Sequence, residues 1–162
     1  MKPTRRRSRE VALQGVYQWL FTGESAGQVL ANLSEMEGFA SADREFLEAE
    51  LRGTIAEAAS LQVLLEPLAD RKWAEVSPIE RAILLIGAWE LVHQQEIPYR
   101  VTINEAIELG KRFGGTDGHK YVNGVLDRLA ADVRASEVAT PRAPRPRKSE
   151  GRSNANEKKA PE

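Results

Sequence analysis

Few residues of this chain have the types and spacing that catalysis or metal binding requires. The two histidines, His93 and His119, fall on different predicted helices, and neither has a second ligand four residues away, as in a zinc-binding HExxH pair. The absence of cysteine excludes thiolate metal sites and disulfides. Residues 114–120, GGTDGHK, resemble a phosphate-binding loop only superficially, because the glycine spacing is wrong and a helix precedes them. The sequence therefore predicts no catalytic residue, no metal site and no cofactor.

The chemistry that the sequence does offer is attraction of anions. The first nine residues contain no acidic side chain and five basic ones, namely Lys2, Arg5, Arg6, Arg7 and Arg9. Residues 137–162 contain seven basic and four acidic residues, so the overall charge of −1 leaves about −9 on the body between the two ends. Arginines attract the phosphates that supply most of the sequence-independent affinity for nucleic acid. On charge alone, a solvated basic terminus is the simpler interpretation of this arm.

Two tyrosines lie where an aromatic ring could contact a partner. Arg6, Glu10 and Tyr17 return to one face of the first predicted helix, so Tyr17 lies among charges and outside the apolar stripe. Tyr121 follows Lys120 near the start of the last predicted helix, where its ring could stack on an unpaired base. The alternatives are a half-buried tyrosine at a stripe edge for Tyr17 and core packing for Tyr121.

The elements that must position these residues are helices, and the most distinct of them begins at Ser77. Ser77 and Glu80 form a capping box, and Pro78 occupies the first helical position, where its missing N–H costs nothing. From residue 82 to residue 92 every residue except Glu90 is apolar or glycine. A helix that is apolar nearly all round is normally enclosed by others, so we expect it at the centre of the core.

The remaining helices follow from apolar periodicity and capping signals. We expect them over residues 5–21, over residues 25–37, and from Ser41 or Asp43 onward. Ser60 is expected to cap a further turn or two before Pro67. Thr102 begins a second capping box, whose helix ends at Gly114 and Gly115, and Thr116 or Asp117 caps the last helix. No window alternates as a half-buried strand does, so the predicted fold class is all-α with about seven helices.

The composition changes after Ser136, which divides the chain into two predicted parts. Residues 1–136 form one helical domain, and residues 137–162 form a basic, proline-rich tail with too few apolar residues to offset the entropy of ordering it. The longest apolar run is far shorter than the roughly 20 residues that span a bilayer. No signal-peptide apolar region follows the basic N-terminus. We therefore expect a cytoplasmic protein that does not contact membranes.

Three segments of this chain resemble the NusB family of bacterial transcription antitermination factors. They are RRRSREVALQGVYQW at residues 5–19, SPIERAILLIGAWEL at residues 77–91, and IPYRVTINEAIELGKRFGGTDGHKYVNGVLD at residues 97–127. The last segment is the most specific, and the resemblance covers roughly residues 3–130. The predicted tail has no counterpart in the family pattern, and position 121 commonly holds an aromatic without a hydroxyl group.

The resemblance implies an all-helical fold of two packed bundles and a function in transcription. NusB-like proteins pair with NusE, which is also a small-subunit ribosomal protein. The pair binds the single-stranded boxA element of nascent RNA and joins the RNA polymerase antitermination complex, notably on ribosomal RNA operons. By position in the motifs, the RNA-binding set is Arg5, Arg6, Arg7, Asp117, Lys120 and Tyr121. The partner-binding set is Tyr17 and Glu80, although capping alone would explain Glu80 and also Asp117. Some NusB-like proteins self-associate, so monomer and homodimer both stay open.

Two rival functions remain to be weighed against an RNA-binding adaptor that catalyses no reaction. Similar helical domains form the RNA-binding part of some ribosomal RNA cytosine methyltransferases, but those enzymes continue into a catalytic domain with a catalytic cysteine, which this chain lacks. A purely structural helical adaptor without RNA affinity is the other alternative. A gel shift with boxA RNA against a scrambled sequence separates that alternative from the first reading.

Overall fold

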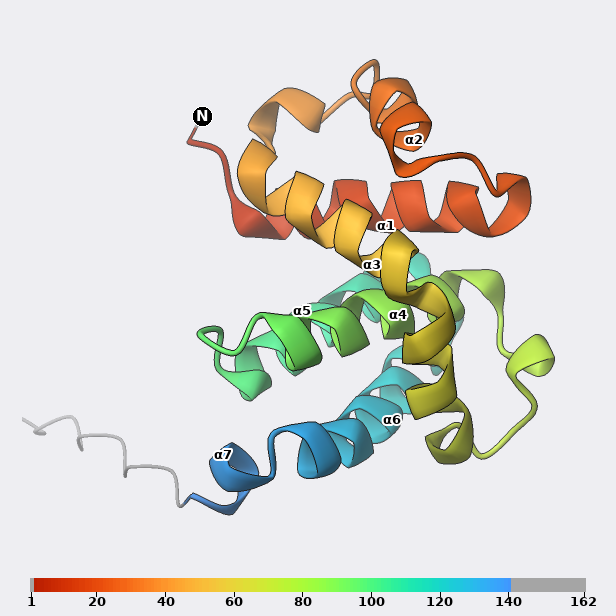
Figure 1. Ribbon diagram of the computed structural model, residues 1–162, viewed down its shortest axis with the longest axis vertical. Coiled ribbons are helices and arrows are strands. Elements are labelled where there is room, and N and C mark those ends of the chain that lie inside the picture. Colours follow the sequence, from red (N-terminus) through yellow and green to blue (C-terminus); the bar gives the residue numbers. More distant parts are fainter. Residues whose placement is uncertain (1, 141–162) are drawn as a thin grey trace, which may run out of the picture.

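The computed structural model describes residues 2–140, and its regular elements are helices (Figure 1). The α-helices are α1 (Arg5–Thr22), α2 (Ala26–Leu33), α3 (Arg44–Leu65), α4 (Pro78–His93), α5 (Tyr99–Phe113), α6 (Gly118–Val133) and α7 (Ala135–Ala139). Short 3-10 turns occupy Phe39–Ser41, Glu66–Leu68 and Trp73–Glu75. Apart from one isolated β-bridge between Thr4 and Ala42, the described residues form no extended pairing. The all-α class with about seven helices is confirmed.

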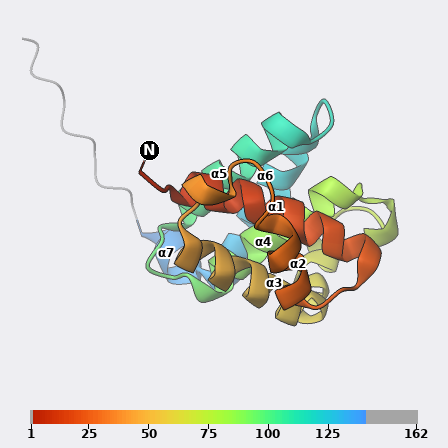
Figure 2. The same cartoon turned by 90° about the horizontal axis from the view of Figure 1, so that it is seen from above.

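The helices form two packed bundles, as the family resemblance implies. Helices α1, α2 and α3 make up the first bundle, and α4, α5 and α6 make up the second. The bundles meet where α1 and α3 pack on α4, and the view from above shows both helices lying over it (Figure 2). Helix α4 therefore serves both bundles at once.

The central position predicted for the Ser77 helix is confirmed. Every residue of α4 from Ala82 to Leu91 is buried, Glu90 included. At its start the backbone N–H of Glu80 donates to the Ser77 hydroxyl oxygen at 3.3 Å, and Pro78 takes the first helical position. The reverse half of the capping box differs from the prediction, because the Glu80 carboxylate accepts from the Ser77 hydroxyl at 2.7 Å and not from its backbone N–H.

Two predicted boundaries in the first bundle are wrong. Ser60 does not begin a new turn, because α3 runs unbroken to Leu65 and the Ser60 hydroxyl donates to the carbonyl of Glu57. Helix α2 ends at Leu33, several residues before the stop predicted at residue 37. By contrast, Asp43 caps α3 as predicted, with its carboxylate accepting from the backbone N–H of Phe46 at 3.2 Å.

The capping box predicted at Thr102 is also wrong. Helix α5 begins three residues earlier at Tyr99, and Thr102 lies inside it, buried, with its hydroxyl 3.5 Å from a carboxylate oxygen of Glu90. The Tyr99 backbone N–H donates to the carboxylate of Glu137 in α7 at 2.8 Å. A side chain distant in sequence thus supplies the cap.

The predicted domain boundary after Ser136 falls inside a helix. Helix α7 continues through Ala139, and Glu137 pairs with the buried Arg134. The Arg134 guanidinium also donates to the carbonyls of Leu91, Gln94 and Ile97, which secures the turn after α4.

The rest of the predicted tail, residues 141–162, lies outside the described residues. Within the part that is described, no helix is both long enough and apolar enough to cross a membrane.

Candidate nucleic-acid interface

The arginine arm is the first turn of α1, and the backbone anchors it. Thr4 caps the helix by accepting from the N–H of Arg7 at 3.1 Å. The Thr4 N–H donates to the carbonyl of Ser41 at 3.1 Å, and the Thr4 carbonyl accepts from the N–H of Asp43 at 3.3 Å. These bonds hold the arm against the segment that precedes α3. The arginines therefore project from a fixed helical turn.

Two of the arm's arginines take part in an ion-pair network with α5, which we call the α1–α5 clasp. Arg6 donates to both carboxylate oxygens of Glu105, at 3.1 and 2.9 Å. Arg7 donates to one oxygen of Glu10 at 2.7 Å, and Arg112 donates to the other at 2.5 Å. The clasp thus contains three arginines and two glutamates drawn from two helices.

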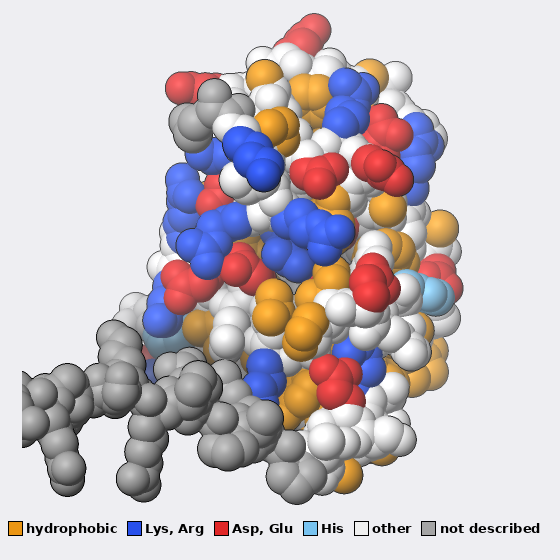
Figure 3. All heavy atoms as spheres, turned by 90° about the vertical axis from the view of Figure 1, so that its left-hand side faces the viewer, with side chains coloured by type: hydrophobic (Ala, Val, Ile, Leu, Met, Phe, Trp, Pro, Cys, Tyr) orange, Lys and Arg blue, Asp and Glu red, His pale blue; other side chains and the backbone are white. Residues whose placement is uncertain are grey.

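The clasp presents its positive groups to solvent and covers its negative ones. The side chains of Arg6 and Arg112 are 64% and 57% exposed, whereas those of Glu105 and Glu10 are only 17% and 12% exposed. Figure 3 shows Lys and Arg side chains gathered on the face that carries the start of α1. Although each carboxylate cancels one positive charge, the outer surface is mostly guanidinium. Such a surface suits phosphate, which accepts paired N–H bonds from arginine.

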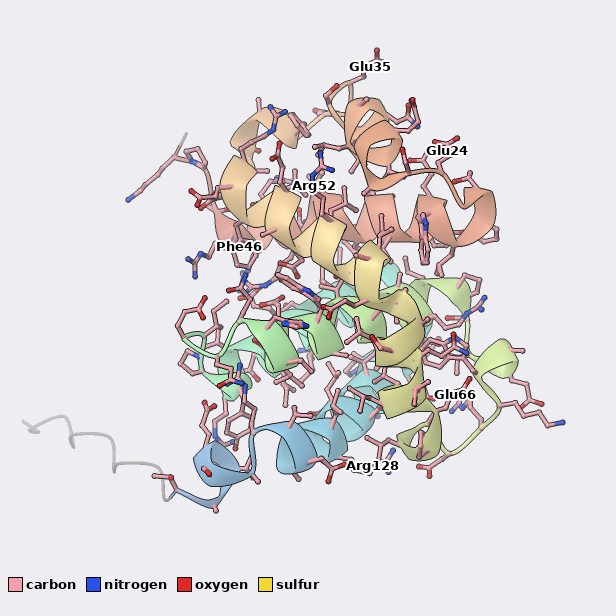
Figure 4. All side chains as sticks on the ribbon, in the orientation of Figure 1. Glu24, Glu35, Phe46, Arg52, Glu66 and Arg128 are labelled. Carbon is pink, nitrogen blue, oxygen red and sulfur yellow. The ribbon has the colours of Figure 1, made fainter. Side chains whose placement is uncertain are left out.

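Arg5 lies apart from this network. Its guanidinium stacks 4.9 Å from the ring centre of Phe46, which Figure 4 places near the start of α3. Arg5 also borders a hollow of about 270 Å³ that Asp43, Glu45 and Glu96 line. Three acidic neighbours make this hollow a poor place for phosphate, so Arg5 has weaker geometric support than Arg6 and Arg7.

Arg9 is the residue of the basic arm that sequence reasoning misplaced. It is buried and makes a two-pronged ion pair with the equally buried Glu90 of α4, with N···O distances of 2.9 and 2.7 Å. A signal was present in the sequence, because Glu90 is the one charged residue in the apolar run from residue 82 to residue 92 and needs a buried partner. Arg9 therefore joins the two bundles and does not belong to the exposed surface.

The second predicted group lies at the start of α6. Asp117 occupies the N-cap position, but its side chain caps no backbone N–H and instead pairs with Lys120 at 3.3 Å. Both side chains are largely exposed. Helix capping by the side chain was the simpler explanation for an acidic residue at position 117. The structure does not contain that cap. The pair is free to contact a ligand.

Tyr121 is held more firmly than its neighbours. Its hydroxyl donates to the carbonyl of Ala69 at 2.7 Å, and the guanidinium of Arg71 lies 4.0 Å from the ring centre. Burial raises the pKa of the phenol, while the charge of Arg71 opposes the rise. The ring packs against the core with its edge partly exposed, so a base stacked on the face that Arg71 covers must displace that guanidinium.

Glu80 of α4 lies next to Asp117, Lys120 and Tyr121 at the start of α6. A Cβ atom at Gly118 would lie 2.2 Å from a carboxylate oxygen of Glu80, so the Glu80 side chain lies directly against the first residue of α6. This contact could not be predicted from the sequence, because 38 residues separate the two positions. Glu80 thus borders Asp117 and Tyr121 as well as capping α4.

Tyr17 lies on a different exposed strip. Its ring meets that of Phe21 edge to face with centroids 5.0 Å apart, and both side chains are exposed. Helix α1 runs antiparallel to α4 (Figure 1), since Arg9 near the start of one pairs with Glu90 near the end of the other. The Tyr17 half of α1 therefore lies beside the Glu80 half of α4. Phe21 is an aromatic member of this strip that sequence reasoning missed, although its spacing of four from Tyr17 pointed to it.

No group of three or more His, Asp or Glu side chains among residues 2–140 is arranged to hold a metal ion. The titratable side chains of the surface groups serve in ion pairs with one another, as in the clasp and in the Asp117–Lys120 pair. The arrangement supports binding of an anionic polymer.

Comparisons with known proteins show what this chain is similar to. A model of the NusB family matches residues 6–131. The transcription antitermination protein NusB of Ralstonia nicotianae is 57% identical over 141 residues, covering 87% of this chain and 91% of the relative. The proteins of the same name from Cupriavidus pinatubonensis and Bordetella pertussis are 56% and 53% identical, and 84% and 95% of their lengths are covered. A solved structure of NusB from T. maritima aligns with a TM-score of 0.75 at 27% identity, covering 86% of this chain and 100% of that one.

Proposed function

The chain belongs to the NusB family of transcription antitermination proteins, and from this premise we propose that it binds single-stranded boxA RNA together with NusE. In this role it helps RNA polymerase to read through terminators, notably in ribosomal RNA operons. It acts as an adaptor without catalytic turnover. A factor that works on nascent bacterial transcripts is placed in the cytoplasm, which is the location we propose.

The observation that carries the proposal is the α1–α5 clasp, whose guanidiniums are exposed above largely covered carboxylates. Phosphate contacts of this kind supply affinity without reading sequence. Arg5, Arg6 and Arg7 form one part of the proposed RNA surface. Asp117, Lys120 and Tyr121 form the other, where an exposed ion pair adjoins an aromatic ring, a combination that suits unstacked bases.

The proposed partner surface is the strip along Tyr17 and Phe21 together with Glu80. Two exposed aromatic rings provide apolar contact area, and the acidic body of the chain complements a basic ribosomal protein such as NusE. Glu80 lies against the first residue of α6. A partner bound there would extend the RNA surface and offset the repulsion between RNA and the acidic body.

The first test measures boxA affinity over a salt series, with and without NusE. We expect NusE to tighten binding, and we expect the double variant Arg6→Glu, Arg7→Glu to weaken it. Each lost phosphate contact lowers the slope of log affinity against log salt by about 0.7 for a single strand. Arg52→Glu is the matched control, because Arg52 is an exposed arginine on α3 outside the clasp (Figure 4). Equal affinity with and without NusE contradicts the cooperative model, and an unchanged slope removes the arm from the RNA surface.

A second test separates the two roles of Glu80. Glu80→Gln retains a side chain that can accept from the Ser77 hydroxyl, while it removes the negative charge. We expect affinity for NusE to fall while thermal stability changes little. If NusE binding stays intact, capping is the better account of Glu80.

The RNA-binding domain of a ribosomal RNA methyltransferase has less support as the function of this chain. The named relatives are antitermination proteins of which this chain covers 84–95%, which favours an adaptor over the RNA-binding part of a methyltransferase. A structural adaptor without RNA affinity remains the second candidate. It predicts no gel shift with either boxA RNA or scrambled RNA.

A further inference from the structure

Arg112 is a member of the clasp to which neither the family motifs nor the arm assigned a role. It lies in the last turn of α5, far from α1 in sequence, yet it shares a single carboxylate with Arg7. One oxygen of Glu10 accepts from Arg7 and the other accepts from Arg112. Glu10 therefore holds two guanidiniums from different helices next to each other.

The charges of this trio leave one positive charge uncompensated. Two guanidiniums meet one carboxylate, and the Glu10 side chain is only 12% exposed while that of Arg112 is 57% exposed. A guanidinium has five N–H donors, and within residues 2–140 Arg112 uses its Nη1 group on Glu10. The other donors of Arg112 remain able to bind an anion on the solvent side.

Arg112 is also accessible from two sides. A hollow of about 260 Å³ is lined by three basic residues, Arg6, Lys111 and Arg112, and by three glutamates, Glu10, Glu105 and Glu108, whereas the hollow at Arg5 has one basic residue against three acidic ones. A second hollow of about 160 Å³ is lined by Arg7 and Phe113 among others. Arg112 and Glu10 line both hollows, so each hollow borders this ion pair.

The position of Arg112 links the two parts of the proposed RNA surface. Through Glu10 it adjoins the arginine arm. The last turn of α5 also packs closely on the first turn of α6, because a Cβ at Gly110 would lie 2.9 Å from the Cα of His119. Lys120 follows directly. A single-stranded RNA that contacts both Arg7 and Lys120 therefore passes the C-terminal end of α5.

We propose that Arg112 binds a phosphate of the RNA between these two parts. This inference rests on the proposed function, since it names a further contact of the same surface. It makes the clasp a continuous phosphate-binding track across α1 and α5.

The test compares Arg112→Ala with the wild-type chain in the presence of NusE, using labelled boxA RNA over a salt series. Loss of one phosphate contact is expected to weaken binding about fivefold at 0.1 M salt and to lower the salt slope by about 0.7. Arg112→Lys keeps the charge and is expected to restore most of the slope. Unchanged affinity and slope in Arg112→Ala overturn the inference.

A matched variant excludes an indirect effect through the clasp. Glu10→Gln weakens the same link between α1 and α5 but leaves Arg112 in place, so RNA binding is expected to stay equal or become tighter. If Glu10→Gln weakens binding as much as Arg112→Ala, the arginine acts through the fold and the inference fails. Loss of preference for boxA over scrambled RNA in the wild-type chain contradicts the proposed function itself, whereas normal wild-type binding with an unaffected Arg112→Ala contradicts only this inference.

Discussion

The α1–α5 clasp and the Arg9–Glu90 pair use the same chemistry one turn apart on α1. In the clasp, the side chain of Arg6 is 64% exposed and lies over a glutamate of α5. In the Arg9–Glu90 pair, both side chains are at most 5% exposed. Water screens the first and leaves its guanidiniums open to a ligand, while the second has no access to RNA. Burial, and not residue type, decides which arginine binds and which one stabilises.

The difference follows from the side of α1 on which each arginine lies. Arg9 shares a face with Leu13 and Val16, which are fully buried, so its side chain enters the core beside α4. Arg6 and Glu10 lie on the face that meets α5 at the surface. A run of arginines that looks uniform in the sequence is therefore divided between two functions.

The buried pair also has a neighbour that the clasp lacks. Glu50 of α3 is completely buried, and within the described residues neither of its carboxylate oxygens accepts a hydrogen bond. Burial raises the pKa of Glu50 well above its ordinary value, and the nearby charge of Glu90 raises it further, while Arg9 and Arg5 oppose the rise. A protonated Glu50 can donate to Glu90, which explains how two carboxyl groups are accommodated beside one arginine.

The largest expected effect comes from breaking the buried pair. Arg9→Met leaves Glu90 buried without a counter-charge, and we expect the free energy of unfolding to fall by about 3–5 kcal/mol in urea melts followed by circular dichroism. The double variant Arg9→Met, Glu90→Leu is expected to recover most of that loss. If Arg9→Met costs less than about 1 kcal/mol, the buried pair does not differ from the surface clasp and the comparison fails.

The next effect concerns the pH dependence of stability. Glu50 has a higher pKa folded than unfolded, so its contribution is fully present below the unfolded value near 4.3 and is lost as pH rises through the folded value. Glu50→Gln is expected to remove this dependence and to raise the free energy of unfolding above that window by on the order of 1–3 kcal/mol. Urea melts in a series of buffers rising from about pH 4 measure it, with Glu48→Gln on the same helix as control. A slope that persists in Glu50→Gln assigns the pH dependence to another group.

The smallest effect is expected in the clasp itself. A double-mutant cycle of Arg6→Ala and Glu105→Ala, followed by thermal unfolding, is expected to give a coupling energy of about 0.2–1 kcal/mol, because the pair is largely solvated. A coupling above about 2 kcal/mol makes the clasp a structural element comparable with the buried pair. The clasp would then contribute to stability as the Arg9–Glu90 pair does, and the assignment of binding to one region and stability to the other would fail.

Most of the helical framework could be predicted because its signals are local. Asp43 and Ser77 cap helices that begin where their own side chains bond the next turn, and the apolar run of α4 predicted its burial. The predictions at Ser60 and Thr102 failed for different reasons. Ser60 lies inside the continuous helix α3, where its hydroxyl donates to the carbonyl of Glu57 three residues earlier. At α5 a residue distant in sequence intervenes, because Glu137 accepts from the backbone N–H of Tyr99 at the start of the helix.

The sequence by itself determined the all-α class, the central helix and the concentration of basic residues near the N-terminus, because composition and periodicity act over a few turns of chain. Only the tertiary structure decided which basic residue does what. It buried Arg9 against Glu90, paired Arg6 with Glu105, and set Arg112 beside Arg7 through one carboxylate. Charge and burial depend on neighbours that folding brings together from about 80 to 100 positions away. That is why the boundary between core and binding surface cannot be found in the arginine run alone.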